Sequence, residues 1–283
     1  MKLLYLNDWN HLCNYNALKS YGFDITEIKR TDIDKIDLKQ YDCVYGPSYP
    51  VNASKYPNVK FIFGPHFSEF PSNNKLNSIR SSNTVYILTS DWIKNIWMSY
   101  DNIKGVTLKV LPFAVNIPVQ TDIRPISERS IVFVYFKERS IQDLRFIEAY
   151  LNKNNINYKV FKYGTYKEEE YIKCLKSAKY AIWIGRHETQ GFALETAFAY
   201  DVPLLVWDVT QLNGKNMCHI ATTIPYWDNR CGEYFHQSHE FETSYNMFLK
   251  KLHTYNPRQY IIENLSKEVC RKRFIDIVNS ITT

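Results

Sequence analysis

The sequence predicts an α/β protein of two doubly wound domains, and three features indicate this class. Short apolar runs typical of buried strands alternate with segments of helical periodicity along most of the chain. Glycine-proline pairs or polar loops follow several of these runs, as is usual where parallel strands end. A proline-containing stretch with little apolar periodicity separates two such sets and is interpreted as a linker. The predicted organisation is an N-terminal domain over residues 1–117, a linker over 118–129, a C-terminal domain over 130–256 and a closing helix over 257–283.

The composition is that of an ordinary soluble globular protein. The 283 residues suffice for two cores, and 45% hydrophobic with 23% charged residues argues against disorder. The net charge of +6 is spread along the chain without the concentrated basic face that nucleic acids require. No apolar run approaches the roughly 20 residues that span a bilayer. We therefore expect a cytoplasmic protein with at most peripheral membrane contact and no nucleic-acid partner.

The six cysteines are scattered and include no Cys-x-x-Cys pair. This spacing gives neither a zinc motif nor a redox-active pair, so we expect reduced, structural thiols.

The first half of the chain begins with a strand, a polar loop and a helix, as doubly wound domains usually do. Ser90 is expected to cap a helix that starts at Asp91. An acidic stretch with Asp-x-Asp spacing, residues 31–37, follows no buried strand and is interpreted as a solvated turn, not a metal site. Strands are predicted at 2–6, 23–28, 41–45, 59–63, 84–88 and 108–111, and a helix at 11–21.

His66 comes directly after Gly64-Pro65, at the end of the predicted strand 59–63. Open α/β folds place ligand contacts where the chain leaves the sheet in this way. A single histidine is more often structural than catalytic, so spacing alone leaves both roles open for His66.

The second half repeats the alternation of strands and helices. Strands are predicted at 130–135, 158–163, 180–184 and 203–207, and helices at 141–152, 167–179, after Gly191, at 240–254 and at 257–280. Residues 208–239 are interpreted as irregular.

The segment from His187 to Tyr200 is the strongest candidate for a ligand site. It reads as a charged loop, a glycine and a helix after a buried strand. The free N–H groups at such a helix start favour an anion, for example a diphosphate. Lys137 and Arg139 follow another strand, and the carboxyl ends of parallel strands meet at one sheet edge. The competing interpretation is that these charged side chains are ordinary solvated surface residues.

These residues resemble the GT-B-fold glycosyltransferases, most closely the retaining family 4 (glycosyl transferases group 1). The resemblance is strongest over residues 129–208 and extends to Phe63-Gly64-Pro65-His66, Thr89-Ser90-Asp91-Trp92 and the segment 111–116. It implies two Rossmann-like domains facing each other across a cleft. It also implies a UDP- or GDP-linked sugar donor held mainly by the C-terminal domain, an acceptor on the N-terminal domain, no essential metal or other cofactor, and a closing helix that crosses back to the N-terminal domain.

The family's motif is a pair of glutamates separated by seven residues and followed by Ala-x-Ala. Glu188 matches the first glutamate, which touches the donor sugar, while Lys137 and Arg139 match the basic diphosphate contacts. Thr196 takes the place of the second glutamate, which holds the ribose, and Glu195 stands one position earlier. Either residue could serve the ribose, and we favour Thr196.

The resemblance also assigns roles outside this motif. His66 resembles the N-domain histidine that contacts the donor sugar, and His11 lies where some inverting relatives keep a catalytic base. The loop 7–10 lacks the family's glycines, which leaves the acceptor side undefined. The expected catalytic residues are Glu188 and His66, and the expected donor-binding residues are Lys137, Arg139, Tyr163, His187, Gln190, Gly191, Phe192, Glu195 and Thr196.

The function expected from this resemblance is hexosyl transfer with retention, without metal, from UDP- or GDP-sugar to a hydroxyl group of a glycan, lipid-linked or protein-linked acceptor. A nucleotide-sugar epimerase or hydrolase of the same fold is one alternative, although it needs further acid/base carboxylates. A catalytically silent nucleotide-sugar or glycan-binding module is another, and the missing second glutamate favours it.

Overall fold

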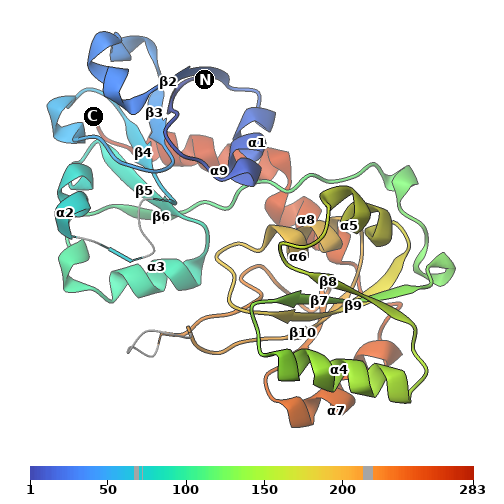
Figure 1. Cartoon of the computed structure of the whole chain (residues 1–283). Helices are drawn as coiled ribbons and strands as arrows, with labels where there is room; N and C mark the ends of the chain where they lie inside the picture. The colour runs from blue at the N-terminus through green and yellow to red at the C-terminus, as the bar shows by residue number, and fades with distance from the viewer. Residues whose placement is uncertain (67–69, 72, 213–218) are drawn as a thin grey trace. The chain divides into compact units, whose positions relative to one another are not determined.

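The computed structural model describes residues 1–66, 70–71, 73–212 and 219–283 (Figure 1). The chain divides into two compact units, one of residues 1–114 with 265–283 and one of residues 115–264. Each unit is built on one parallel β-sheet, of six and five strands respectively. The predicted α/β class with two parallel-sheet domains is thus confirmed.

The first unit has the strand order β2-β1-β3-β4-β5-β6. Its strands are β1 (Lys2–Leu6), β2 (Asp24–Ile28), β3 (Cys43–Gly46), β4 (Phe61–Phe63), β5 (Thr84–Leu88) and β6 (Leu108–Val110). Its helices are α1 (Leu12–Ser20), α2 (Asn73–Leu76), α3 (Asp91–Met98) and α9 (Lys267–Ser280). Because β2 and β3 lie on opposite sides of β1, the strand order reverses between β1 and β3. Open α/β sheets bind ligands beside the loops that follow such a pair of strands.

Helix α9 joins this unit although it lies at the other end of the sequence. Arg271 Nε donates to the carbonyl of Tyr21 at 2.9 Å, and Lys60 Nζ donates to the carbonyl of Val278 at 3.1 Å. The ring of Phe274 packs against Phe23.

The second unit has the strand order β11-β10-β9-β7-β8. Its strands are β7 (Ile131–Lys137), β8 (Tyr158–Lys162), β9 (Ala178–Gly185), β10 (Leu204–Trp207) and β11 (Gly232–Phe235). Its helices are α4 (Ile141–Lys153), α5 (Glu168–Leu175), α6 (Phe192–Ala199), α7 (Phe241–Lys250) and α8 (Pro257–Leu265). Figure 1 shows α4 and α7 on one face of this sheet and α5, α6 and α8 on the other. The strand order reverses between β7 and β9, so the loops after these two strands are where a ligand is expected.

The structure corrects the interpretation of residues 208–239 as irregular, because β11 lies within them. Its four residues pair in parallel with β10, Leu204 opposite Gly232. A Cβ atom on Gly232 would lie 1.9 Å from the carbonyl oxygen of Leu204. The glycine that reads as a loop residue in the sequence is therefore what permits this close strand pairing.

Three helix predictions are also wrong in detail. The expected single helix over 257–280 is two helices, because Ser266 leaves the helical conformation and its hydroxyl accepts a hydrogen bond from Val269 N as the cap of α9. Helix α5 ends at Leu175, and the rest of its predicted range includes the start of β9. Ser90 occupies the N-cap position of α3, but its buried hydroxyl makes no hydrogen bond in the described structure.

Candidate functional site

Lys137 and Glu188 form a close, largely buried ion pair in the second unit. Lys137 Nζ donates to Glu188 Oε1 at 2.7 Å and to Oε2 at 2.9 Å, and the two side chains are only 13% and 12% exposed. Lys137 ends β7 and pairs with Gly185 of β9, so both side chains leave the sheet at the point where the strand order reverses. Burial raises the pKa of the Glu188 carboxyl, and the ammonium group of Lys137 opposes that rise.

The ring of Tyr163 completes the surroundings of Lys137. Lys137 Nζ lies 4.5 Å from the ring centroid, which is a cation–π distance, and Tyr163 itself is 53% exposed. An exposed ring beside a cation therefore flanks the sheet edge at the end of β8.

Backbone contacts hold the loop that carries Glu188. Arg186 N donates to the carbonyl of Lys137 at 3.0 Å, and Glu188 N donates to the carbonyl of Thr222 at 2.9 Å. Gly191 has a φ of 97°, a left-handed conformation that favours glycine, and an added Cβ would lie 3.4 Å from Glu188 Cβ. The loop thus turns tightly into α6 with the Glu188 side chain against Gly191.

Glu195 and Thr196, the two candidates for the ribose contact, lie in different environments. Glu195 is fully buried, and its Oε2 accepts a hydrogen bond from Gln190 Nε2 at 3.0 Å. Thr196 is half-buried, and its hydroxyl donates to the carbonyl of Phe192 at 2.7 Å. His187 and Phe192 are half-buried on the same loop and helix start.

Arg139 is bound by groups of the protein at the same sheet edge. Its Nε donates to Asp143 Oδ2 at 3.1 Å, and its Nη1 donates to the carbonyls of Gly185 and Trp207 at 3.2 and 3.3 Å. The guanidinium also lies 5.1 Å from the ring centroid of Trp207. These contacts fix Arg139 between β7, β9 and β10, and its role as a diphosphate contact stays a prediction.

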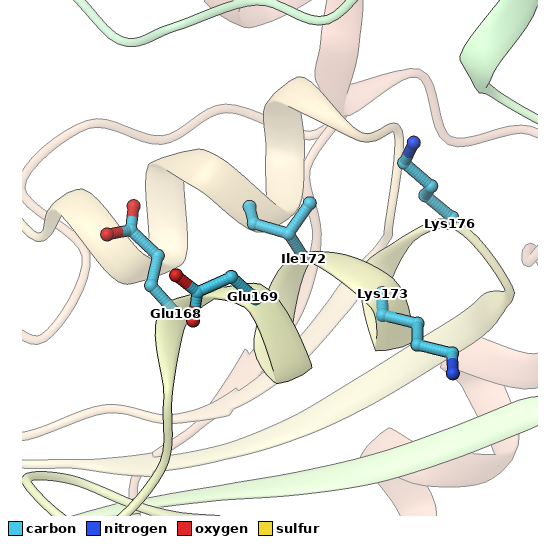
Figure 2. Close-up of a pocket in the computed structure, with 5 residues that line it drawn as sticks. All are labelled: Glu168, Glu169, Ile172, Lys173 and Lys176. Carbon is cyan, nitrogen blue, oxygen red and sulfur yellow. The ribbon is translucent and has the colours of Figure 1, made fainter.

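Two hollows lie on the second unit. One, of about 380 Å³, is at the start of α4 and the ends of β10 and β11, and its lining includes Arg139, Asp143, Asp208 and His236. The other, of about 450 Å³, runs along exposed side chains of α5. Figure 2 shows Glu168 and Glu169 near one end of that helix and Lys173 and Lys176 near the other. No predicted site residue lines the hollow on α5, so the larger hollow is not the candidate site.

His66 lies in the first unit, at the end of β4. Asn14 Nδ2 lies 2.9 Å from His66 Nε2, so the amide donates to an unprotonated ring nitrogen. The ring of Trp9 meets the imidazole edge-on at 4.9 Å, and the ring of His11 stacks on it at 5.9 Å. Burial, with a smaller contribution from His11, lowers the pKa of His66 to about 4. His66 is therefore neutral at pH 7.

Asn14 is a residue that sequence reasoning missed. It is buried on α1 and lies 52 positions from His66 in the chain, where no local pattern links them. Only the packing of α1 beside the β4 loop makes the amide a partner of the imidazole.

The acidic stretch 31–37 contributes an ion pair and a hydrogen bond. Asp32 pairs with Lys35 at 2.7 Å within a short 3-10 helix, and Asp34 accepts a hydrogen bond from Tyr56. Within the described ranges, no group of three or more His, Cys, Asp or Glu side chains could hold a metal ion. The five cysteines in these ranges form no disulfide, and Cys218 lies outside the described residues. None of the helices described is both long and apolar enough to cross a membrane.

Comparison with known proteins identifies the fold. No protein-family model and no curated protein sequence matches the chain. Among solved structures, the apo form of the lipopolysaccharide outer core galactosyltransferase WaaB is similar over 99% of each chain, with a TM-score of 0.60 and 13% identity. Sucrose-phosphate synthase from Thermosynechococcus elongatus is similar over 98% of each chain, with a TM-score of 0.56 and 12% identity.

A third similar structure is AviGT4, a glycosyltransferase involved in avilamycin A biosynthesis. The similarity covers 99% of this chain and 97% of that one, with a TM-score of 0.56 and 9% identity. At such identities the likeness concerns the fold, and it extends over both units. The chain therefore has the two-sheet α/β architecture of the GT-B glycosyltransferases.

Proposed function

We propose that the protein is a glycosyltransferase that moves a hexose-type sugar from a UDP- or GDP-linked donor to a hydroxyl group of a glycan, lipid-linked or protein-linked acceptor. The transfer proceeds with retention at the anomeric carbon and without a metal ion. The observation that carries this proposal is the largely buried Lys137–Glu188 pair, which lies where the strand order of the second sheet reverses and near the start of α6 at Gly191.

This arrangement suits the departure of a nucleoside diphosphate. Negative charge grows on the leaving phosphate oxygen as the sugar–oxygen bond breaks, and positive groups already in place lower that barrier. Lys137 supplies a cation, and the N-terminus of α6 supplies N–H groups and the positive end of its dipole. Both act on the same developing charge.

Glu188 then serves the sugar. Its carboxylate oxygens accept hydrogen bonds from Lys137 in the described structure, and they accept hydrogen bonds from sugar hydroxyls when Lys137 turns to the diphosphate. His66, neutral at pH 7, is suited to hydrogen bonding with the donor sugar and adds no charge of its own. Thr196 offers its hydroxyl oxygen to the ribose, and Tyr163 offers an exposed ring to the base.

The test is a panel of nucleotide sugars with release of UDP or GDP as the readout, with and without EDTA. We expect release from one donor, unchanged by EDTA and accelerated by a sugar-bearing acceptor. Glu188→Gln keeps the shape of the side chain and should lower kcat by about 10³-fold, because it removes an interaction at the reacting sugar. Glu168→Gln, on the exposed face of α5, is the matched control and should keep wild-type activity.

Each other outcome of the panel opposes the proposal. Full activity of Glu188→Gln would remove Glu188 from the reaction. Binding of a nucleotide sugar without turnover would identify a silent binding module, and an altered sugar still attached to its nucleotide would identify an epimerase. Loss of activity with EDTA would contradict the metal-independent mechanism.

A further inference from the structure

Glu195 is a fully buried acidic residue in the first turn of α6, five residues after Gln190. It has no exposed surface, and Gln190 is only 3% exposed. Gln190 Nε2 donates to Glu195 Oε2 at 3.0 Å, whereas Glu195 Oε1 makes no hydrogen bond to any described residue. One carboxyl oxygen thus holds a side chain of the Glu188 loop, and the other lies in the interior.

This environment does not suit a ribose contact. A ligand hydroxyl needs a surface atom, and both oxygens of Glu195 are covered by the protein. Thr196, one residue later, is half-buried and keeps hydroxyl lone pairs after donating to Phe192. The two neighbours therefore differ in what they can reach.

We propose that Glu195 is a positioning residue: through Gln190 it holds the loop 186–191, and with it Glu188, in the geometry needed for sugar transfer, and it does not touch the nucleotide. This inference rests on the proposed function for its kinetic consequence but not for its structural one. Gln190 lies between Glu188 and Gly191, so a shift of its side chain moves the residue that faces the donor.

The hydrogen bond from Gln190 to Glu195 connects the loop 186–191 to α6. A buried amide that loses its acceptor cannot turn to water, so removing the Glu195 carboxyl should displace Gln190. Displacement of a catalytic side chain by about 1 Å can cost about 10²-fold in rate.

The carboxyl is suited to this role in its uncharged form. An ionised carboxylate is costly in a buried site where one of its oxygens has no hydrogen-bond partner among the described residues. Burial accordingly raises the pKa of Glu195 well above its ordinary value, although Gln190 opposes the rise. A glutamine at this position keeps the acceptor oxygen and the neutral state, so Glu195→Gln is the conservative variant.

The experiment compares Glu195→Ala, Glu195→Gln and Gln190→Ala by steady-state kinetics and by amide hydrogen exchange of the peptide covering 186–191. We expect Glu195→Ala and Gln190→Ala each to lower kcat by about 10²-fold, with KM for the nucleotide sugar changed less than about threefold. The loss in the double variant should be smaller than the sum of the two single losses, because both substitutions remove the same Gln190–Glu195 hydrogen bond. Glu195→Gln should restore kcat to within about threefold of wild type, and Glu169→Gln on α5 serves as the exposed control.

The exchange measurement needs no substrate and separates this inference from the proposed function. Exchange in 186–191 should rise about tenfold in Glu195→Ala and Gln190→Ala and stay near wild type in Glu195→Gln. Unchanged exchange in the alanine variants would overturn the positioning role whether or not the enzyme is active. A rise in KM with unchanged kcat in both Glu195 variants would instead make Glu195 a ribose ligand. Gln190→Ala tests the same link if Glu195→Ala does not fold.

Discussion

The two units carry their candidate groups in opposite electrostatic settings. In the second unit, Lys137 and Glu188 form a charged pair at 2.7 Å, and both side chains are largely buried. In the first unit, His66 is half-buried beside Trp9, His11 and Asn14, and its imidazole is kept neutral. The difference shows that a strand end can hold either a charge compensated by an opposite charge or a polar group kept neutral by its surroundings.

The largest expected effect comes from removing the cation of the Lys137–Glu188 pair. Lys137→Met leaves Glu188 buried without its cation, and it should lower the free energy of unfolding at pH 7 by about 3 kcal/mol. Urea denaturation measures this loss. The double variant Lys137→Met with Glu188→Gln should recover most of it, because no buried charge then remains unpaired. A cost below about 0.5 kcal/mol for Lys137→Met would show that water solvates the pair.

The second prediction concerns a negative charge placed beside the neutral imidazole of His66. Asn14→Asp places a carboxylate beside His66 Nε2, and an adjacent negative charge should raise the pKa of His66 by about 1–3 units. An NMR titration of the His66 ring protons measures the shift. Asn14→Leu, which removes the hydrogen bond without adding charge, is the control and should leave the pKa low. An unchanged pKa in Asn14→Asp would mean that the amide does not face the ring.

The third prediction concerns stability as the pH falls. The pKa of His66 is lowered to about 4 in the folded chain, while the unfolded chain titrates near 6.5. Between pH 6.5 and 4 the unfolded state therefore binds more protons, so stability should fall with decreasing pH, by up to about 1.4 kcal/mol per pH unit from this group. In His66→Gln the decrease across this window should be shallower. Urea denaturation of the wild type and His66→Gln at pH 6.5, 5.5 and 4.5 measures this dependence. Equal slopes of unfolding free energy against pH in the two proteins would contradict the lowered pKa of His66.

The smallest expected effect concerns the proposed ribose contact of Thr196. Thr196→Val removes one hydroxyl from the proposed ribose contact and should weaken binding of the matching nucleoside diphosphate by about 3- to 10-fold, as for one neutral hydrogen bond. Calorimetry measures the affinity. Thr254→Val is a matched control, since Thr254 also donates its hydroxyl to a backbone carbonyl, that of Lys251 at 2.7 Å. Equal affinity of wild type and Thr196→Val would exclude the ribose contact.

Much of the fold could be predicted from local patterns. The apolar runs 2–6 and 84–88 are β1 and β5 without a change of bounds, and the predicted strands 158–163 and 203–207 each differ from β8 and β10 by one residue at one end. β1, β5 and β10 are buried along nearly their whole length, so hydrophobicity alone predicts them. β11 escaped this reading because its four residues, Gly-Glu-Tyr-Phe, carry only a weak apolar pattern and begin with a glycine.

The candidate site divides in the same way. The sequence by itself indicated the Gly191 turn, the helix that follows it and the charged residues at two strand ends, because these depend on residue type and near neighbours. Only the tertiary structure decided that Lys137 pairs with Glu188 across 51 positions, that Glu195 is enclosed while Thr196 is not, and that Asn14 meets His66. Strand order and helix packing decide which distant side chains meet and which are shielded from water. Contact and shielding in turn determine the pKa of each group and whether a ligand can touch it.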